Sequence, residues 1–316
     1  MFPMSFNEIA QAVGGCLLQG NGELVVSVVS TDSRKIARDE LFIPLVGENF
    51  DGHSFIEKAL AEGAMGFIIS KDGHPISADL PVIKVDDTLK ALQLLAAYNR
   101  AKFAGRVIAV TGSNGKTSTK DMITSVLSKK FKTIKTEGNL NNEIGLPLTL
   151  LRIGPEHQVA VVEMGMRGLG QISQLAVLAE PDIGVITNIS EVHLELLGSI
   201  DNIAQAKGEL LNHLDRRGTA ILNGDELLIR READQFGGEK IFYGLSKAND
   251  LRAEQVQVNE QGSTYTAVYA GQSVPIKVPV LGSHNVLNSL AAVAVGLKLG
   301  LTWLEIAAAG YCLYYP

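Results

Sequence analysis

Residues 106–118 read RVIAVTGSNGKTS, and this stretch decides the fold class of the second half of the chain. RVIAV is a short apolar run, typical of a strand buried on both faces, and a helical pattern begins at Lys116. Glycines between a strand and a helix let backbone N–H groups close around phosphate oxygens, and the helix N-terminus adds positive potential. The Lys116 ammonium can reach the phosphates of a nucleotide, and the Thr117 hydroxyl can bind Mg²⁺. The sequence therefore predicts a nucleotide-binding loop formed by Gly112, Ser113, Asn114, Gly115, Lys116, Thr117 and Ser118.

This loop departs from the usual pattern G-x-x-x-x-G-K-[ST]. Val110 occupies the position of the first glycine of that pattern, and Gly112 follows two residues later. The predicted loop is therefore tighter than usual. The alternative is a glycine-rich turn without function, which the strand before the loop and the helix after it argue against.

Further apolar runs follow the loop at 158–164, 182–188 and 219–223, separated by helical patterns. Continuous apolar runs that alternate with helices indicate a parallel sheet covered on both faces. Residues 255–280 alternate polar and apolar side chains, which predicts a small antiparallel sheet, and residues 285–299 predict an apolar helix. The second half is therefore expected to be a nucleotide-binding domain with a mainly parallel sheet flanked by helices.

The first 86 residues predict a separate, small mixed α/β domain. A capping pattern at Ser5 and Glu8 opens a helix that ends at the glycine pair 14–15. Strands are expected at 24–30, 41–47, 66–70 and 81–85, with a helix at 53–64. A helical stretch over 87–102 is expected to lead into the next domain. We therefore predict an α/β protein with domains at 1–86 and 87–316.

Composition excludes several classes of protein. The net charge is −6, so a nucleic-acid partner is not expected, since such proteins usually present a basic face. Apolar runs are too short for a membrane span, and the N-terminus lacks the pattern of a secretory signal. The two cysteines have no metal-type spacing and predict no disulfide framework. These features predict a cytoplasmic location.

Two residues follow strands at the sheet edge where parallel sheets place their ligands. Glu163 ends the run VAVV and is either a surface carboxylate or, beside a nucleotide, a ligand for Mg²⁺. His193 lies in the loop after the next strand. It is either a solvated histidine or a metal ligand.

Lys207 interrupts the apolar stripe of a predicted helix. It lies four residues after Ile203 and three before Leu210. One interpretation is a buried stem whose ammonium reaches water. The other is a guarded amine that captures CO₂ and becomes a carbamate, whose two oxygens suit a second Mg²⁺.

Four stretches together resemble a known family. They are TGSNGKTS (111–118), VVEMG (161–165), NISEVHLELLGSIDNIAQAKGEL (188–210) and GSHNVLNSLAA (282–292). In this order they are similar to the ATP-binding core of the Mur ligases, which add amino acids to the UDP-linked peptidoglycan precursor. The resemblance extends along the whole chain.

Two further stretches indicate which member of the family is most similar. Residues 31–55 resemble the uridine-diphosphate domain of the two members that act late, and TEGNLNNEIGLPLTLLR (136–152) resembles the member that joins D-alanyl-D-alanine to UDP-N-acetylmuramoyl-tripeptide. The resemblance implies that the tripeptide carboxylate attacks ATP to form an acyl phosphate, which the dipeptide amine then attacks. The alternatives are the member that adds the third amino acid, a folate polyglutamylating enzyme, and a nucleotide-binding fragment without catalysis.

The resemblance also implies roles for individual residues. Lys116, His193 and Lys207 would be catalytic, and ATP would be bound with two Mg²⁺ ions. The metal ligands would be Thr117, Glu163, His193 and a carbamoylated Lys207. Asn285 and Asn288 would lie near the adenine, or would instead cap a helix start. The UDP-substrate would contact Asn141 and Asn142, and its uridine would contact Ser33, Arg34, Asp51 and His53.

The chain departs from the family at its end. The family has a third, C-terminal domain, and the sequence stops at AAAGYCLYYP (307–316), near its expected start. We therefore expect this chain, taken as a monomer, to bind ATP but to ligate poorly alone, because closure around the site would lack one side.

Overall fold

The computed structural model describes residues 1–48, 50–74, 76–192 and 194–309. The chain divides into two compact units, the first formed by residues 1–104 and 143–155 and the second by residues 105–142 and 156–316. The predicted boundary after residue 86 differs from this division, since helix α3 (Thr88–Ala101) groups with the first unit. The segment 143–155 also belongs to the first unit, and no local sequence pattern predicts this return.

The first unit is a small mixed α/β structure, as the sequence predicts. Its five-stranded sheet has the order β2-β7-β6-β5-β4, in which β4 to β7 are parallel and β2 is antiparallel to β7. A second sheet pairs β1 with β3. The strands are β1 (Met4–Ser5), β2 (Cys16–Gln19), β3 (Val25–Val26), β4 (Val29–Ser30), β5 (Leu41–Phe42), β6 (Gly66–Ile69) and β7 (Val82–Lys84). The helices are α1 (Phe6–Val13), η1 (Gly52–Phe55), α2 (Ile56–Ala61), α3 and α5 (Gly145–Leu151).

Helices α3 and α5 pack against each other within this unit. The buried Asn99 of α3 donates from Nδ2 to the carbonyls of Leu150 and Ile153, at 2.9 and 3.0 Å. The Leu150 carbonyl lies in the last turn of α5, where it also accepts from Ile153 N, and the Ile153 carbonyl lies just beyond the helix. The side-chain amide of Asn99 therefore adds two hydrogen bonds to the helix packing that holds the returning segment against α3.

The second unit contains one nine-stranded sheet. Its order is β16-β15-β14-β13-β12-β11-β8-β10-β9, and the seven strands β8 to β14 are parallel to one another. The predicted antiparallel strands extend this same sheet through β15 and β16. The strands are β8 (Arg106–Thr111), β9 (Thr133–Lys135), β10 (Val159–Glu163), β11 (Ile183–Ile186), β12 (Thr219–Asn223), β13 (Glu239–Gly244), β14 (Leu251–Asn259), β15 (Gly262–Tyr269) and β16 (Gln272–Val278).

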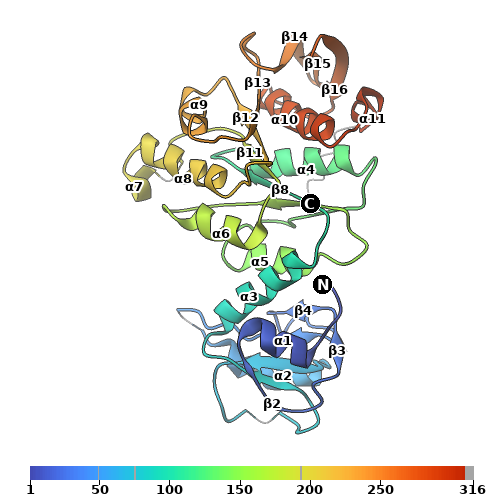
Figure 1. The fold of residues 1–316 in the computed structure, drawn as a ribbon, viewed down its shortest axis with the longest axis vertical. Helices are drawn as coiled ribbons and strands as arrows, with labels where there is room; N and C mark the ends of the chain where they lie inside the picture. The colour runs from blue at the N-terminus through green and yellow to red at the C-terminus, as the bar shows by residue number, and fades with distance from the viewer. Residues whose placement is uncertain (49, 75, 193, 310–316) are drawn as a thin grey trace. The chain divides into compact units, whose positions relative to one another are not determined.

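Helices cover both faces of this sheet, so that its central strands are buried as their apolar runs predict. Helices α4 and α10 pack together on one face, and α6, α8 and α9 form a row on the other (Figure 1). The helices of this unit are α4 (Lys116–Leu127), α6 (Gln171–Ala179), α7 (Leu194–Leu197), α8 (Ile200–Asn212), α9 (Leu227–Ala233), α10 (His284–Lys298) and α11 (Trp303–Ala307). In the part of the chain that the structure describes, no helix combines the length and the apolar character that crossing a membrane requires.

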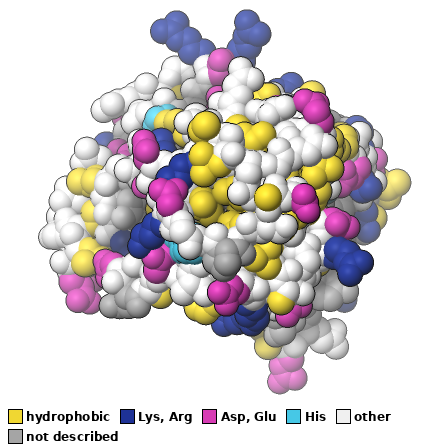
Figure 2. All heavy atoms as spheres, turned by 90° about the horizontal axis from the view of Figure 1, so that it is seen from below, with side chains coloured by type: hydrophobic (Ala, Val, Ile, Leu, Met, Phe, Trp, Pro, Cys, Tyr) yellow, Lys and Arg dark blue, Asp and Glu magenta, His cyan; other side chains and the backbone are white. Residues whose placement is uncertain are grey.

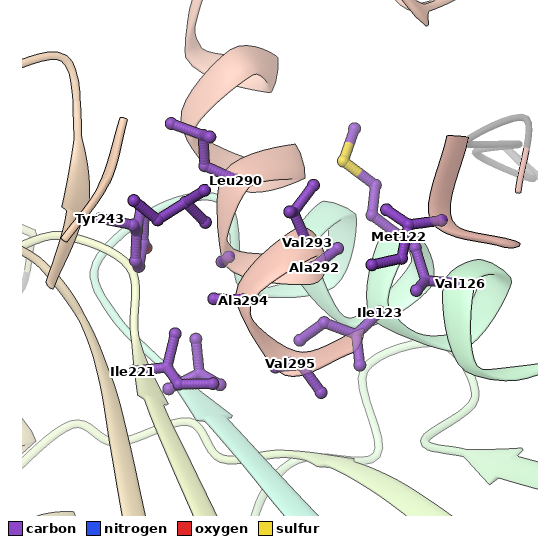
Figure 3. Close-up of a cluster of buried hydrophobic side chains, with 14 of the residues drawn as sticks. Met122, Ile123, Val126, Ile221, Tyr243, Leu290, Ala292, Val293, Ala294 and Val295 are labelled. Carbon is purple, nitrogen blue, oxygen red and sulfur yellow. The ribbon is translucent and has the colours of Figure 1, made fainter. Parts of the chain in front are cut away.

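The core of the second unit lies between the sheet and the pair α4–α10. Figure 3 shows Val293 and Val295 of α10 on the side of Ile123 of α4, whereas Leu290 lies on the side of Tyr243 of β13. Helix α10 is buried along most of its length, which fits the continuous apolar run from Leu290 to Val295.

Hydrophobic side chains also reach the surface. Figure 2 shows one face of the molecule, on which they form an area bordered by basic and acidic side chains. In the first unit Phe50, Val25 and Leu18 are more than half exposed. Such exposure is ordinary in folded proteins, because polar atoms cannot cover the whole surface.

We expect Leu290→Ala to destabilise the second unit by about 2–5 kcal/mol, because it opens a cavity between α10 and the sheet. Urea unfolding followed by the fluorescence of Trp303 measures this effect, since the only tryptophan of the chain packs against this core. The control is Leu227→Ala, at a side chain that is 81% exposed, with an expected change within about 0.5 kcal/mol. Equal midpoints for the two variants would contradict the assigned core.

Candidate active site

The predicted phosphate loop connects the end of β8, which lies between β11 and β10 in the nine-stranded sheet, to the start of α4. Gly115 precedes the helix with a φ of +76°, and Gly112 has a φ of +148°. A Cβ on Gly112 would lie 1.9 Å from Thr187 Oγ1, so a side chain cannot be accommodated there without a shift. Both glycines are therefore required by backbone geometry as well as by close approach.

The segment after β11 holds this loop in shape. Ser113 N donates to the Asn188 carbonyl at 3.0 Å, and Asn114 N donates to Asn188 Oδ1 at 2.8 Å. The Thr187 hydroxyl donates to the Asn114 carbonyl at 2.7 Å, and Ser190 N donates to Ser113 Oγ at 2.9 Å. The sequence did not assign a role to Thr187, Asn188 or Ser190, although all three directly follow an apolar strand.

Lys116 lies within the loop rather than in solvent. Its Nζ donates to the carbonyls of Gly112 and Ser113, at 2.8 and 3.1 Å. Burial lowers the pKa of the Lys116 ammonium, while the charge of Glu163 acts in the opposite direction. The cation is thus already placed where the loop would receive an anion.

Glu163 is almost fully buried at the end of β10, and its carboxylate meets the start of α4. The Thr117 hydroxyl donates to Oε2 at 2.9 Å, and Asn141 Nδ2 donates to Oε1 at 2.7 Å. A hydroxyl and a carboxylate are oxygen ligands of the type that Mg²⁺ prefers. Thr117 and Glu163, the two residues predicted as Mg²⁺ ligands, are therefore in contact in the structure, and their metal role stays a prediction.

Mg²⁺ fits this donor set. Among the residues that the structure describes, no group of three or more histidine, cysteine, aspartate or glutamate side chains is arranged to hold a metal. Mg²⁺ is commonly bound by one or two carboxylates together with waters and substrate phosphates, so Thr117 and Glu163 beside the loop are sufficient protein ligands for one ion. His193, the other predicted ligand, lies outside the described residues.

Asn141 has a different observed partner from the predicted one. The resemblance assigned it to the UDP-substrate, together with Asn142, whereas its amide in this structure is bonded to Glu163. The backbone carbonyl of Asn141 also accepts from Gly165 N at 2.8 Å. The substrate contacts of both asparagines stay predictions.

Lys207 occupies the buried side of α8, as its place in the apolar stripe predicts, and only 3% of its surface is exposed. Burial lowers the pKa of Lys207 to about 7, and repulsion from the Lys116 charge contributes. A large share of this amine is therefore neutral near pH 7. Neutral amines are the form that reacts with CO₂.

The first turn of α10 lies against the phosphate loop. Asn288 Oδ1 accepts from the Thr119 hydroxyl at 3.2 Å, and a Cβ on Gly115 would lie 2.6 Å from the same oxygen. Asn288 Nδ2 donates to Asn285 Oδ1 at 3.0 Å, and Asn285 Nδ2 donates to the Leu281 carbonyl at 2.7 Å. Both side chains are buried next to the loop, and their role toward an adenine stays a prediction.

The residues predicted for a uridine pocket lie in the first unit. Asp51 Oδ1 is 2.7 Å from His53 Nδ1, and His53 Nε2 accepts from Ser70 N at 3.0 Å. A hydrogen bond from Lys71 lowers the pKa of Asp51. The ring of His74 stacks on that of His53, with the centroids 5.4 Å apart. The structure thus joins Asp51 and His53 in one ordered group.

Ser33 and Arg34 lie in the turn after β4. Ser33 is buried, while Arg34 is exposed and pairs with Asp32 at 2.8 Å. The hydrogen bond from Arg34 lowers the pKa of Asp32 to about 2. The pair of Arg34 with Asp32 stabilises the turn itself, and this explains the position of Arg34 without a ligand. A contact of Arg34 with a nucleotide stays a prediction.

Two family models match the chain. The Mur ligase middle domain covers residues 110–296, and the model described as the Mur ligase family, catalytic domain, covers residues 25–100. The UDP-N-acetylmuramoyl-tripeptide–D-alanyl-D-alanine ligase of Bacillus subtilis is 43% identical over 302 residues, which are 95% of this chain. The chain spans about 65% of the length of that relative.

Solved structures give the same result for the fold. A crystal structure of MurF from Acinetobacter baumannii matches with a TM-score of 0.91 and 32% identity, covering 99% of this chain and 69% of that one. MurF from Thermotoga maritima, in complex with ADP, matches with a TM-score of 0.80 and 28% identity, covering 90% of this chain and 66% of that one.

We expect Gly112→Ala to weaken the binding of ADP–Mg²⁺ at least about tenfold, a change of about 1.4 kcal/mol, because its Cβ would push the loop away from Thr187. Isothermal titration calorimetry measures the affinity. Gly237→Ala is the matched control, since a Cβ there meets no atom within 4 Å. If Gly112→Ala binds as the control does, the loop is not the nucleotide site.

Proposed function

The chain belongs to the Mur ligase family, and we propose that it acts in joining D-alanyl-D-alanine to UDP-N-acetylmuramoyl-tripeptide with the consumption of ATP. The observation that carries this proposal is the contact of Thr117 with the buried Glu163 at 2.9 Å, directly beside Lys116 in the phosphate loop. It unites a phosphate cradle with an Mg²⁺ ligand set. The relatives at 33–43% identity that bear this ligase name support the choice of substrates.

The proposed reaction has two steps, which use two different properties of the site. A carboxylate oxygen of the tripeptide attacks the γ-phosphorus of ATP, and ADP leaves, giving an acyl phosphate. The amine of D-alanyl-D-alanine then attacks the acyl carbon, loses a proton and expels phosphate. The first step brings two anions together, so positive charge in the phosphate loop stabilises it.

The chain's own residues contribute binding, orientation and charge. Lys116 would leave the carbonyls of Gly112 and Ser113 to bind phosphate oxygens, while the N–H groups of the loop hold the rest of the phosphate chain. Mg²⁺, when bound by Thr117 and Glu163, would neutralise phosphate charge. Thr187 and Asn188 keep the loop from collapsing when Lys116 moves.

The first unit is proposed to bind the UDP part of the substrate. Within the ordered group, the partly exposed Asp51 carboxylate and Lys71 ammonium lie at the surface of this unit, and the buried His53 holds Asp51 in place. A uracil ring offers amide-like donors and acceptors, and a diphosphate requires positive charge. Ser33 and Arg34 are proposed as further contacts, and Asn141 and Asn142 as contacts from the second unit.

The test of the proposed reaction is ADP release by this chain under four conditions: ATP alone, with each substrate separately, and with both. We expect slow release, because this chain is expected to ligate poorly alone, and release above background only when both UDP-tripeptide and D-alanyl-D-alanine are present. With ¹⁸O in the tripeptide carboxylate, the released phosphate should carry one ¹⁸O, because the attacking oxygen leaves with phosphorus. ADP release from ATP alone, unchanged by either substrate, would contradict the ligase.

Other outcomes identify the alternatives. Calorimetry that shows binding of ATP and the UDP-tripeptide without any turnover would indicate a binding module. A UDP-linked dipeptide that accepts a free amino acid, in place of the tripeptide and D-alanyl-D-alanine, would indicate the family member that adds the third residue.

A carbamate on Lys207 is the finer part of the proposal, and a second Mg²⁺ would use its oxygens. The pKa of Lys207 is lowered, so the neutral amine predominates above about pH 7. At constant CO₂ pressure we therefore expect carbamate formation to rise between pH 6 and 8. The step joins the amine nitrogen to the carbon of CO₂ and releases one proton.

Carbon-13 NMR under ¹³C-labelled CO₂ measures this carbamate. The signal should be absent in Lys207→Met and retained in Lys129→Met, which removes an exposed lysine. An equal signal in wild type and in Lys207→Met would remove Lys207 from the metal site.

A further inference from the structure

Lys120 is a second buried lysine of the site, and the proposed reaction does not use it. It lies one helical turn after Lys116 on α4, and only 2% of its surface is exposed. Its Nζ is 3.4 Å from Asp121 Oδ1 and 3.9 Å from Glu163 Oε2. A fully buried lysine is rare unless it is paired, so these two carboxylates are the reason that the ammonium is tolerated.

The pairs form a chain of alternating charges. Lys135, at the end of β9, lies 2.7 Å from Asp121, which is followed by Lys120 and then by Glu163. The chain runs from a partly exposed cation to the carboxylate that contacts Thr117. It has no net charge, so it can remain buried without a further counter-ion.

The same ammonium also fixes the backbone after β9. Lys120 Nζ donates to the Thr136 carbonyl at 2.9 Å, and the Thr136 hydroxyl accepts from Glu163 N at 3.0 Å. Thr136 begins the segment that leads to Asn141, whose amide donates to the second carboxylate oxygen of Glu163. Lys120 therefore acts on Glu163 directly by charge and indirectly through this segment.

Stability alone is a poor reason for this arrangement. A buried ion pair is often no more stabilising than apolar side chains of similar size, because both ions lose their hydration. The pair of Lys120 and Glu163 instead favours one orientation of the Glu163 carboxylate, at the end of β10 and facing Thr117. Groups that orient a metal ligand typically change metal affinity by about 10- to 100-fold when they are removed.

We propose that Lys120 is a positioning residue for the Mg²⁺ site. It holds Glu163 and the segment 136–141 in one fixed arrangement, so that Mg²⁺ meets a preset carboxylate. This inference rests on the proposed function in one respect, namely that Thr117 and Glu163 bind Mg²⁺ with the nucleotide. Lys120 itself touches neither nucleotide nor metal.

The test is the Mg²⁺ dependence of ATP binding by the whole chain. Lys120→Met removes the ammonium and leaves two buried carboxylates, Asp121 and Glu163, with Lys135 as the remaining cation of the cluster, so it can also impair folding. The variant that combines Lys120→Met with Asp121→Asn keeps the net charge of the cluster and isolates positioning. We expect the double variant to unfold close to the wild-type temperature and to require about tenfold more Mg²⁺ for half-maximal ATP binding. Lys129→Met, an exposed lysine just after the same helix, is the matched control.

A double-mutant cycle with Asn141→Ala identifies the route. Lys120 and Asn141 act on the same carboxylate. The combined variant should therefore raise the Mg²⁺ requirement by less than the sum of the two separate effects. The positioning role would be overturned if the variant that combines Lys120→Met with Asp121→Asn had the Mg²⁺ dependence of wild type. It would also be overturned if the effects of Lys120→Met and Asn141→Ala were fully additive. Both outcomes leave the proposed function intact. A wild-type chain that binds no ATP at any Mg²⁺ concentration would overturn both.

Discussion

The hydrogen bond between Thr117 and the carboxylate of Glu163 is the contact on which the second unit's site depends. It connects the first turn of α4 to the end of β10, and it exists because parallel strands end at one edge of the sheet. Every other element of the site is placed relative to this edge. The phosphate loop leaves β8 there, the segment after β11 supports the loop there, and Asn141 approaches Glu163 from the segment after β9.

The phosphate loop is stabilised by hydrogen bonds that do not involve its lysine. Asn188 and Thr187 satisfy the backbone of Ser113 and Asn114, whereas Lys116 bonds only to loop carbonyls that an anion can replace. A loop that kept its shape through Lys116 would have to rearrange on binding. Here the cation can exchange carbonyl oxygens for phosphate oxygens at little conformational cost, which is the meaning of a preorganised site.

Local patterns predicted the parts of the molecule that local forces determine. The buried strand before Gly112, the position of Glu163 at a strand end and the burial of Lys207 all follow from periodicity. The return of residues 143–155 to the first unit does not, because it depends on the packing of α5 against α3 and on hydrogen bonds from Asn99, which are distant in sequence. Lys120 could have been noticed by the argument used for Lys207, since it too lies on a buried helix face. Its distant partners could not, because Thr136 follows β9 and Glu163 ends β10.

The two buried lysines show how the same burial cost leads to different chemistry. Desolvation disfavours an ammonium unless an opposite charge is near. Lys120 has Asp121 and Glu163 within 4 Å, and its ammonium is used to hold structure. Around Lys207, burial lowers the pKa of the amine to about 7, and the positive charge of Lys116 contributes to the same shift. A neutral amine can form a covalent bond to CO₂, whereas an ammonium cannot, because it has no free electron pair. In the proposed mechanism, the distribution of carboxylates around the site therefore decides which lysine would orient a metal ligand and which would become one.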